Sequence, residues 1–200
     1  SGSDHLAWPF VNTQDLLGRI EPLLSRVNKP IQYVGGEYNS IVKEWQDVDV
    51  RWVLMYPDAY EVGQPNQGVA ILYEVLNERD WMLAERTYSV WPDMERQMRA
   101  AGIPQFTLDG HRPVRDFDIM SVSLSTELGY TNMLNAIDLA GIPVRQADRT
   151  DTDPIVLIGG HAAFNPEPVA DFIDAAVLGD GEEACLEISE IIRDWKKEGC

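Results

Sequence analysis

Four short segments of the sequence combine glycines with hydroxyl, imidazole or carboxylate side chains, each directly after an apolar run. They read PDAYEVG at residues 57–63, SLSTELG at 123–129, GGHAAFNPEP at 159–168 and GDGEE at 179–183. Glycine lets the backbone approach a bulky partner because no Cβ is in the way. The sequence shows no Ser–His–Asp-like arrangement and no cluster of metal ligands. We therefore expect these segments to bind a ligand and to catalyse no reaction by themselves.

Single residues in these segments allow two interpretations. His161 could contact a cofactor or substrate, or it could be a surface or capping histidine. Asp58 follows Pro57 and could equally be a turn residue. The adjacent Glu182 and Glu183 indicate acid–base chemistry only weakly, because neighbouring residues of a helix point apart. The strongest ligand candidates are the two glycine turns, since backbone geometry alone rarely requires both.

The apolar runs before these segments alternate with helical patterns. Expected strands cover residues 48–56, 82–90, 117–125, 155–158 and 175–178, and expected helices cover 68–78, 92–102, 128–141 and 182–195. This alternation predicts an α/β fold, a flavodoxin-like (Rossmann-like) doubly wound parallel sheet with helices on both faces. Ligands of such sheets bind beyond the carboxyl ends of the strands. Residues 57–63, 123–126, 159–164 and 179–182 are thus expected to form one crevice.

The tetrapeptide AGIP occurs twice, at residues 101–104 and 140–143, each time after an expected helix. The glycine suits a left-handed residue that ends a helix, and the proline prevents its continuation. The pieces that follow, IPQFTL and IPVRQA, are rich in β-formers, and we expect each to be a short strand.

Residues 1–48 do not follow the alternation, and we name them the lead-in; residues 49–200 form the expected α/β domain. Within the lead-in, residues 12–27 predict a helix capped by Asn12 or Thr13 and bent or broken at Pro22. The rest of the lead-in, to about residue 45, reads as a turn-rich connection. We expect the chain to be a fragment of a longer protein.

Composition excludes several classes of partner. The chain has 33 acidic residues and 16 Lys plus Arg, a formal charge of −17, which repels phosphate backbones and anionic lipid. No apolar run approaches the length of a membrane span. Two cysteines without a disulfide framework predict a reducing, cytoplasmic location. Neither GxGxxG nor GxxxxGK[ST] follows the first strand, so no phosphate site is expected, and a free-standing flavodoxin-like electron carrier is the least favoured function.

In their order, PDAYEVG, SVSLS, LIGGHAAFNPEP and VLGDGEE resemble the N-terminal, B12-binding-type domain of B12-binding-domain-containing radical SAM proteins. The closest similarity is to an uncharacterised family that carries this domain ahead of the radical SAM barrel, and it covers roughly residues 32–195. Cobalamin-binding domains of the methionine synthase type have DxHxxG, then SxL, then GG. The residues that fall on these motifs are Asp58, Tyr60 and Gly63; Ser123 and Ser125; and Gly159 and Gly160.

Two positions depart from those motifs. Tyr60 stands in place of the histidine that ligates cobalt, and Ser125 stands in place of the leucine. A phenol, with a pKa of about 10, is a poor match for imidazole. Radical SAM relatives often lack the histidine as well, so the resemblance implies corrinoid binding without that ligand.

The resemblance implies an accessory domain that positions cobalamin at the sheet edge, facing its own downstream radical SAM domain. A 4Fe-4S cluster and S-adenosylmethionine would belong to that domain, because the cysteine motif CxxxCxxC does not occur in this sequence. The parent protein is then an enzyme, and this segment alone is not. The alternative is a degenerate, cobalamin-free module for interaction or substrate presentation. The implied cofactor-binding residues are Asp58, Tyr60, Gly63, Ser123, Ser125, Gly159, Gly160, His161, Gly179, Asp180 and Gly181.

Overall fold

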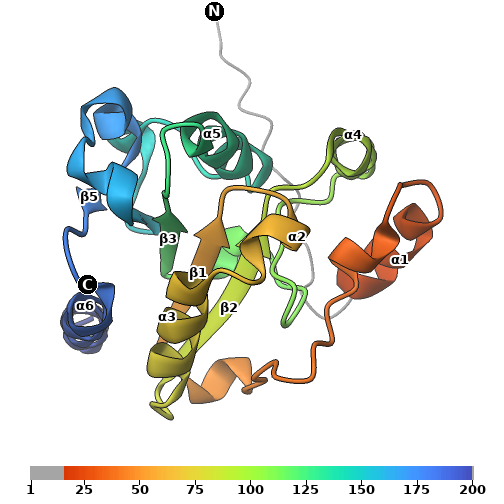
Figure 1. Ribbon diagram of the computed structural model, residues 1–200. Coiled ribbons are helices and arrows are strands. Elements are labelled where there is room, and N and C mark those ends of the chain that lie inside the picture. Colours follow the sequence, from red (N-terminus) through yellow and green to blue (C-terminus); the bar gives the residue numbers. More distant parts are fainter. Residues whose placement is uncertain (1–15, 200) are drawn as a thin grey trace, which may run out of the picture.

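A computed structural model describes residues 16–199, and within them five parallel strands form a single sheet (Figure 1). The strands lie in the order β2-β1-β3-β4-β5. Their bounds are β1 Val50–Tyr56, β2 Met82–Tyr88, β3 Ile119–Ser123, β4 Ile155–Gly159 and β5 Ala175–Ala176. This order is that of a flavodoxin-like sheet, and it confirms the predicted fold class. Strand β2 lies on one side of β1, and β3, β4 and β5 follow on the other side, so the direction in which strands are added reverses between β1 and β3. This position is the switch point at which such folds bind ligands.

Helices cover both faces of the sheet (Figure 1). Helices α3 (Gln67–Asn77) and α6 (Gly181–Lys197) pack on one face, and α5 (Gly129–Leu139) packs on the other. The helices α1 (Leu16–Leu24) and α4 (Pro92–Ala101) pack together beside the sheet. Shorter helices are α2 (Tyr60–Gly63), η2 (Pro30–Tyr33), η3 (Trp45–Asp47), η4 (Val114–Asp116), η5 (Gln146–Asp148), η6 (His161–Phe164) and η7 (Glu167–Phe172).

The central strand β1 shows why its sequence forms a buried strand. Successive side chains point to opposite faces, so Trp52 and Leu54 pack under α3 and α6 while Val53 and Met55 pack under α5. A strand buried on both faces needs apolar residues at nearly every position, as in the sequence VRWVLMY. The indole of Trp52 donates to Ser189 Oγ of α6 at 2.8 Å, so its one polar atom is also satisfied.

Both AGIP glycines end their helices as predicted. Gly102 and Gly141 have φ values of 64° and 72°, in the left-handed region. The amide of Ile103 donates to Met98 O, and that of Ile142 donates to Ile137 O. These bonds close the helix ends in the manner that a left-handed glycine allows.

The prediction that IPQFTL and IPVRQA form strands was wrong. The first makes one isolated antiparallel bridge, between Phe106 and Pro113, and the second leads into η5. Proline lacks the N–H that a ladder requires, and each piece begins with an Ile-Pro pair. Strand β3 begins 11 residues after the end of the first piece and β4 begins 8 residues after the end of the second, so both pieces are connections.

The lead-in packs against the outer edge of β2. Helix α1 confirms the expected helix, with Pro22 inside it; the proposed caps Asn12 and Thr13 lie outside the described residues. Leu16, Ile20 and Leu23 pack on Met94 and Met98 of α4. All seven residues of β2 are buried, although it is an edge strand and includes Glu85 and Arg86. No helix among residues 16–199 is both long and apolar enough to cross a membrane.

Candidate functional site

The four predicted ligand segments all lie at one edge of the sheet. They follow the carboxyl ends of β1, β3, β4 and β5, and these strands are all parallel. The structure therefore brings them to the side where doubly wound sheets bind ligands. Within this edge, however, the individual residues fall into groups with different surroundings.

The first group joins the loops that follow β3 and β4. The amide of Leu124 donates to Gly159 O at 2.8 Å, and the amide of Ala162 donates to Leu124 O at 3.0 Å. Gly160 has a φ of 89°, and a Cβ at this position would lie 2.7 Å from Leu124 O. Gly160 is therefore required by the close contact between these two loops, whether or not a ligand binds.

A second contact spans the switch point of the sheet. Tyr56 is the last residue of β1, and its hydroxyl lies 3.1 Å from Ser125 Oγ in the loop after β3. This contact between two hydroxyl groups joins the end of β1 to the loop after β3, at the switch point of the sheet. Ser123, the last residue of β3, lies opposite Gly159 in the ladder between β3 and β4.

An open cavity of about 410 Å³ lies beside these contacts, between the loops after β3 and β4. Its volume is within the usual range of ligand sites, about 300–1,000 Å³. Two predicted residues, Ser125 and His161, lie in its wall. The complete lining is Ser125, Thr126, Glu127, His161, Ala162, Phe164 and Asn165. The wall offers hydroxyl, imidazole, carboxylate and amide groups together with one aromatic ring, which lies 6.4 Å from the His161 ring.

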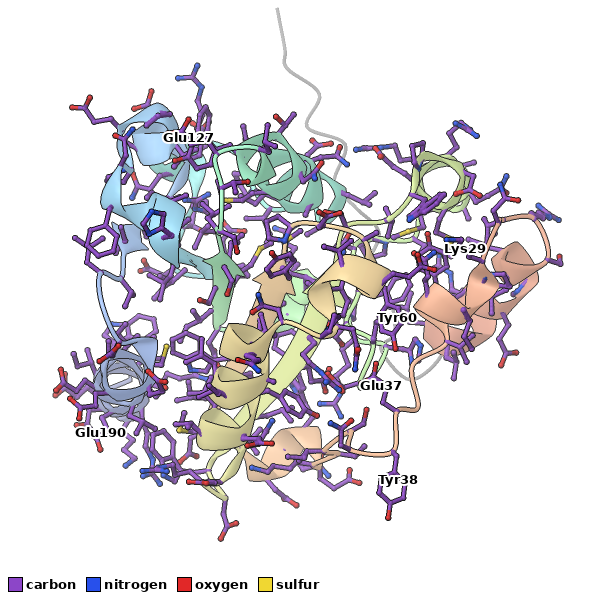
Figure 2. All side chains as sticks on the ribbon, in the orientation of Figure 1. Lys29, Glu37, Tyr38, Tyr60, Glu127 and Glu190 are labelled. Atoms are coloured by element: carbon purple, nitrogen blue, oxygen red, sulfur yellow. The ribbon has the colours of Figure 1, made fainter. Side chains whose placement is uncertain are left out.

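Tyr60 belongs to a different group, at the other end of this edge. Its hydroxyl donates to Glu37 Oε1 of the lead-in at 2.5 Å, and its ring packs edge-on against Tyr88 at 5.5 Å between centroids. Figure 2 shows Tyr60 and Glu37 close together beside α2, well separated from Glu127 at the cavity. Burial and the neighbouring Glu37 carboxylate raise the pKa of Tyr60 to about 12, so its phenol is protonated at neutral pH.

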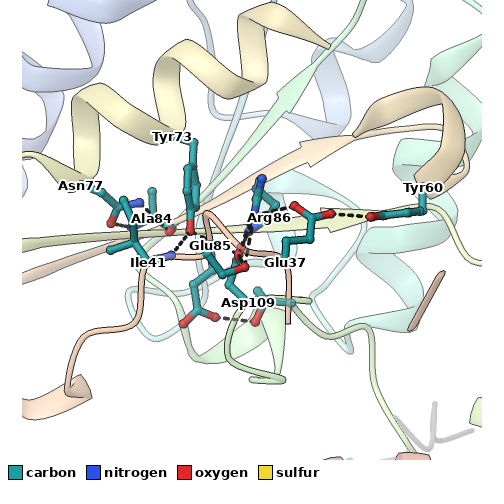
Figure 3. A network of polar contacts seen from close by, with 11 residues as sticks. Glu37, Ile41, Tyr60, Tyr73, Asn77, Ala84, Glu85, Arg86 and Asp109 are labelled. Atoms are coloured by element: carbon teal, nitrogen blue, oxygen red, sulfur yellow. Dashed lines mark hydrogen bonds and ion pairs between the residues drawn. The ribbon is translucent and has the colours of Figure 1, made fainter. Parts of the chain in front are cut away.

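Glu37 is in turn part of a polar network on the edge strand (Figure 3). Arg86 of β2 lies 3.1 Å from Glu37 Oε2 and 2.8 Å from Asp109 Oδ1, and its guanidinium stacks on the Tyr73 ring at 4.1 Å. The Tyr73 hydroxyl donates to Asp109 and accepts from the amide of Ile41. The network joins the lead-in, β2, α3 and the loop that carries Asp109, and through Tyr60 it extends to α2.

Asp58 and Gly63 have local structural roles. The Asp58 side chain accepts from the next amide, that of Ala59, at 2.7 Å, and its carbonyl accepts from Ser89 N. A Cβ at Gly63 would lie 2.5 Å from the Tyr88 ring. Both observations agree with a turn that packs closely on β2.

The glycine turn at residues 179–181 is open. Gly179 has a φ of 93°, and a Cβ there would meet nothing within 4 Å. Asp180 precedes the first turn of α6, but its side chain makes no capping hydrogen bond. The turn therefore leaves backbone exposed without an internal contact that explains it.

Apolar side chains surround this edge. Val62, Leu128, Phe164 and Leu178 each lie in a segment that follows a strand, and their exposed fractions run from 52% to 86%. Other exposed apolar residues, such as Val42 and Ile191, lie elsewhere on the chain, so these four are simply the ones that a partner bound at this edge would cover.

Other chemistry is limited in the described part of the chain. Residues 16–199 contain no group of three or more His, Cys, Asp or Glu side chains that could hold a metal ion. Burial raises the pKa of the Cys185 thiol to about 12, which leaves it protonated and unreactive in the core.

Sequence reasoning did not find Glu37 or Tyr56, which hold Tyr60 and Ser125. Tyr56 could have been found as the last residue of the first strand. Glu37 carries no local signal, because it lies in a turn-rich connection 23 residues before Tyr60. Glu127 and Asn165, also in the cavity wall, lie in the segments 123–129 and 159–168 and directly follow the expected crevice residues 123–126 and 159–164.

Comparison with known proteins gives one family. A search of curated proteins finds no match. A family model described as "Radical SAM proteins, N-terminal" matches residues 68–200, which is two thirds of the chain and includes the loops after β3, β4 and β5. The chain therefore belongs to the family of N-terminal domains of radical SAM proteins.

Proposed function

We propose that this domain is an accessory domain of a radical SAM enzyme and that it positions a cobalamin at the carboxyl-end edge of its sheet. The observation that carries the proposal is the cavity of about 410 Å³ between the loops after β3 and β4, with Ser125 and His161 in its wall. The family match supports the accessory role. The proposed cofactor supplies methyl transfer or modulates radical chemistry when it is bound.

The residues around the cavity fit a corrinoid in part. The hydroxyl groups of Ser125 and Thr126 can contact amide groups and a nucleotide tail, and the apolar Phe164 can cover them. Tyr60 does not fit the role of cobalt ligand, because its hydroxyl donates to Glu37 and its ring packs on Tyr88. The residues of the cavity wall would therefore hold the corrinoid, and Tyr60 would not ligate its cobalt.

The test is a titration of the full-length protein with hydroxocobalamin, followed by visible absorbance. Thr126→Trp fills the cavity, and Tyr38→Trp places the same side chain at a fully exposed residue of the lead-in as the control. We expect saturable binding by wild type and Tyr38→Trp and at least tenfold weaker binding by Thr126→Trp. Tyr60→Ala should give the same spectrum as wild type. The isolated chain should bind with a Kd in the micromolar range or weaker, because one side of the cavity stays open. Such a Kd corresponds to a binding free energy no more favourable than about −8 kcal/mol. If the full-length protein shows no saturable change, the corrinoid proposal fails.

A second candidate is the cobalamin-free module, and the Tyr60–Glu37 contact favours it, since the position used elsewhere for the cobalt ligand is engaged internally. In this function the apolar residues of the edge bind the radical SAM domain directly. Phe164→Asp should then weaken binding of the separately purified radical SAM domain, measured by calorimetry. Ile31→Asp, at a residue 71% exposed on the lead-in, should not. Equal effects of the two substitutions would contradict this interface.

A further inference from the structure

The side chain of Gln32 is buried in the lead-in without any hydrogen bond. Gln32 lies in η2 and is 1% exposed, and neither its Oε1 nor its Nε2 has a partner among the described residues. An amide can accept two hydrogen bonds and donate two. A buried polar group without a partner destabilises a protein, because it loses its hydrogen bonds to water and gains none in return. A residue so placed therefore requires an explanation.

A second group of the same kind lies close by. Ser89 follows β2, and its Oγ is likewise buried without a partner among residues 16–199. Gln32 and Ser89 line the same small cavity, which also includes Tyr60, Tyr88 and Gln105. The polar groups of two other walls are already used: Gln105 Nε2 donates to Thr87 Oγ1 and Tyr88 O, and Tyr60 donates to Glu37. The unsatisfied groups that face this cavity are thus an amide and a hydroxyl.

Size and chemistry together define what can bind there. The cavity leaves about 10 Å³ for the centre of a water-sized sphere. This is room for one water molecule and too little for an organic ligand. Gln32 and Ser89 are neutral, so they favour a neutral molecule that both donates and accepts over a bare ion. Buried waters of this kind make about two to four hydrogen bonds to groups that are otherwise unsatisfied.

We propose that one ordered water molecule binds between the Gln32 amide and Ser89 Oγ and joins the lead-in to the carboxyl end of β2. This site is separate from the cavity proposed for cobalamin and does not depend on it. The lead-in is already attached to β2 by the ion pair between Glu37 and Arg86, and Glu37 also accepts a hydrogen bond from Tyr60. The water would add a second attachment, at Ser89.

A high-resolution crystal structure of the chain tests the site directly. We expect an ordered water about 2.7–3.2 Å from both a Gln32 side-chain atom and Ser89 Oγ. Absence of density at this place, or density for a side chain that fills it, would overturn the proposal.

Thermal unfolding of variants gives an independent test with opposite signs. Gln32→Met keeps the shape of the side chain and removes its polar atoms. With the water bound, we expect Tm to fall by about 2–4 °C. Without it, the substitution removes two unsatisfied groups and Tm should rise. Gln67→Met, at an exposed position of α3, is the control and should leave Tm unchanged.

Ser89→Ala should couple with Gln32→Met because both side chains bind the same water, whereas strictly additive effects of the two substitutions on Tm would contradict the shared site.

Discussion

Single residues at the carboxyl-end edge of the sheet serve the structure as much as any ligand. Gly160 is the clearest example, because its φ of 89° and its approach to Leu124 O both require the absence of a side chain. Gly179 shares the positive φ, at 93°, but has open space around it. The two glycines therefore separate the effect of backbone conformation from that of close packing.

We predict that Gly160→Ala lowers the free energy of unfolding by about 2–4 kcal/mol, since backbone strain and the contact with Leu124 O act together. Gly179→Ala should cost only about 1–2 kcal/mol, the strain alone. Urea denaturation followed by circular dichroism measures both. Equal losses would mean that the loop after β3 moves away to admit the new methyl group.

Tyr60 gives a prediction about pH. Its pKa is raised from 10.0 to about 12 in the folded protein, first by burial and then by Glu37. The unfolded chain loses this proton near pH 10, so the stabilisation is complete below pH 10 and is lost as the pH rises toward 12. The urea midpoint of wild type should thus fall more steeply over this range than that of Tyr60→Phe. Parallel curves for the two proteins would show that the phenol has no raised pKa.

At the scale of elements, the edge strand β2 depends on segments distant in sequence. The ion pair between Arg86 and Asp109 fixes the loop before β3 to β2, and the Asp109 side chain is only 1% exposed. The ion pair between Arg86 and Glu37 fixes the lead-in to the same strand. These segments cover an edge that would otherwise present unpaired backbone groups to other chains. Breaking this network should therefore affect both stability and association.

We predict that Asp109→Asn lowers the free energy of unfolding by about 3–5 kcal/mol, because it leaves the buried Arg86 without its main partner. The matched control is Glu78→Gln, which removes an exposed ion pair with Arg79 and should change the free energy by less than about 0.5 kcal/mol. Chemical denaturation provides the values. A loss below 1 kcal/mol for Asp109→Asn would show that Glu37 alone satisfies Arg86.

At the scale of the whole molecule, the net charge of −17 opposes the compact state through self-repulsion. The range of this repulsion shrinks from about 30 Å at 0.01 M salt to about 8 Å at 0.15 M. We therefore expect Tm to rise by about 2–4 °C between these two concentrations of NaCl. In Glu190→Lys the charge changes from −17 to −15, and the rise should be smaller. A Tm that falls with added salt would mean that the ion pairs outweigh the repulsion.

The sequence by itself determined the fold class, the order of the main strands and helices, and the edge at which the four candidate segments meet. These features depend on local periodicity, on glycine at helix ends and on the rule that parallel strands share one carboxyl edge, all of which can be read along the chain. The exceptions, such as IPQFTL, are short pieces where proline removes the backbone donor that a strand needs.

Only the tertiary structure decided how the candidate residues are divided along that edge. Tyr60 and Ser125 both fall on motif positions, yet Tyr60 turns to Glu37 while Ser125 meets Tyr56 and the open cavity. The direction of a side chain depends on partners that the fold brings from far along the chain, and no local pattern encodes them. The same reason hides the pairing of Arg86 with Asp109 and the shared cavity of Gln32 and Ser89: their sequence separations are 23 and 57 residues, and only packing sets their distances.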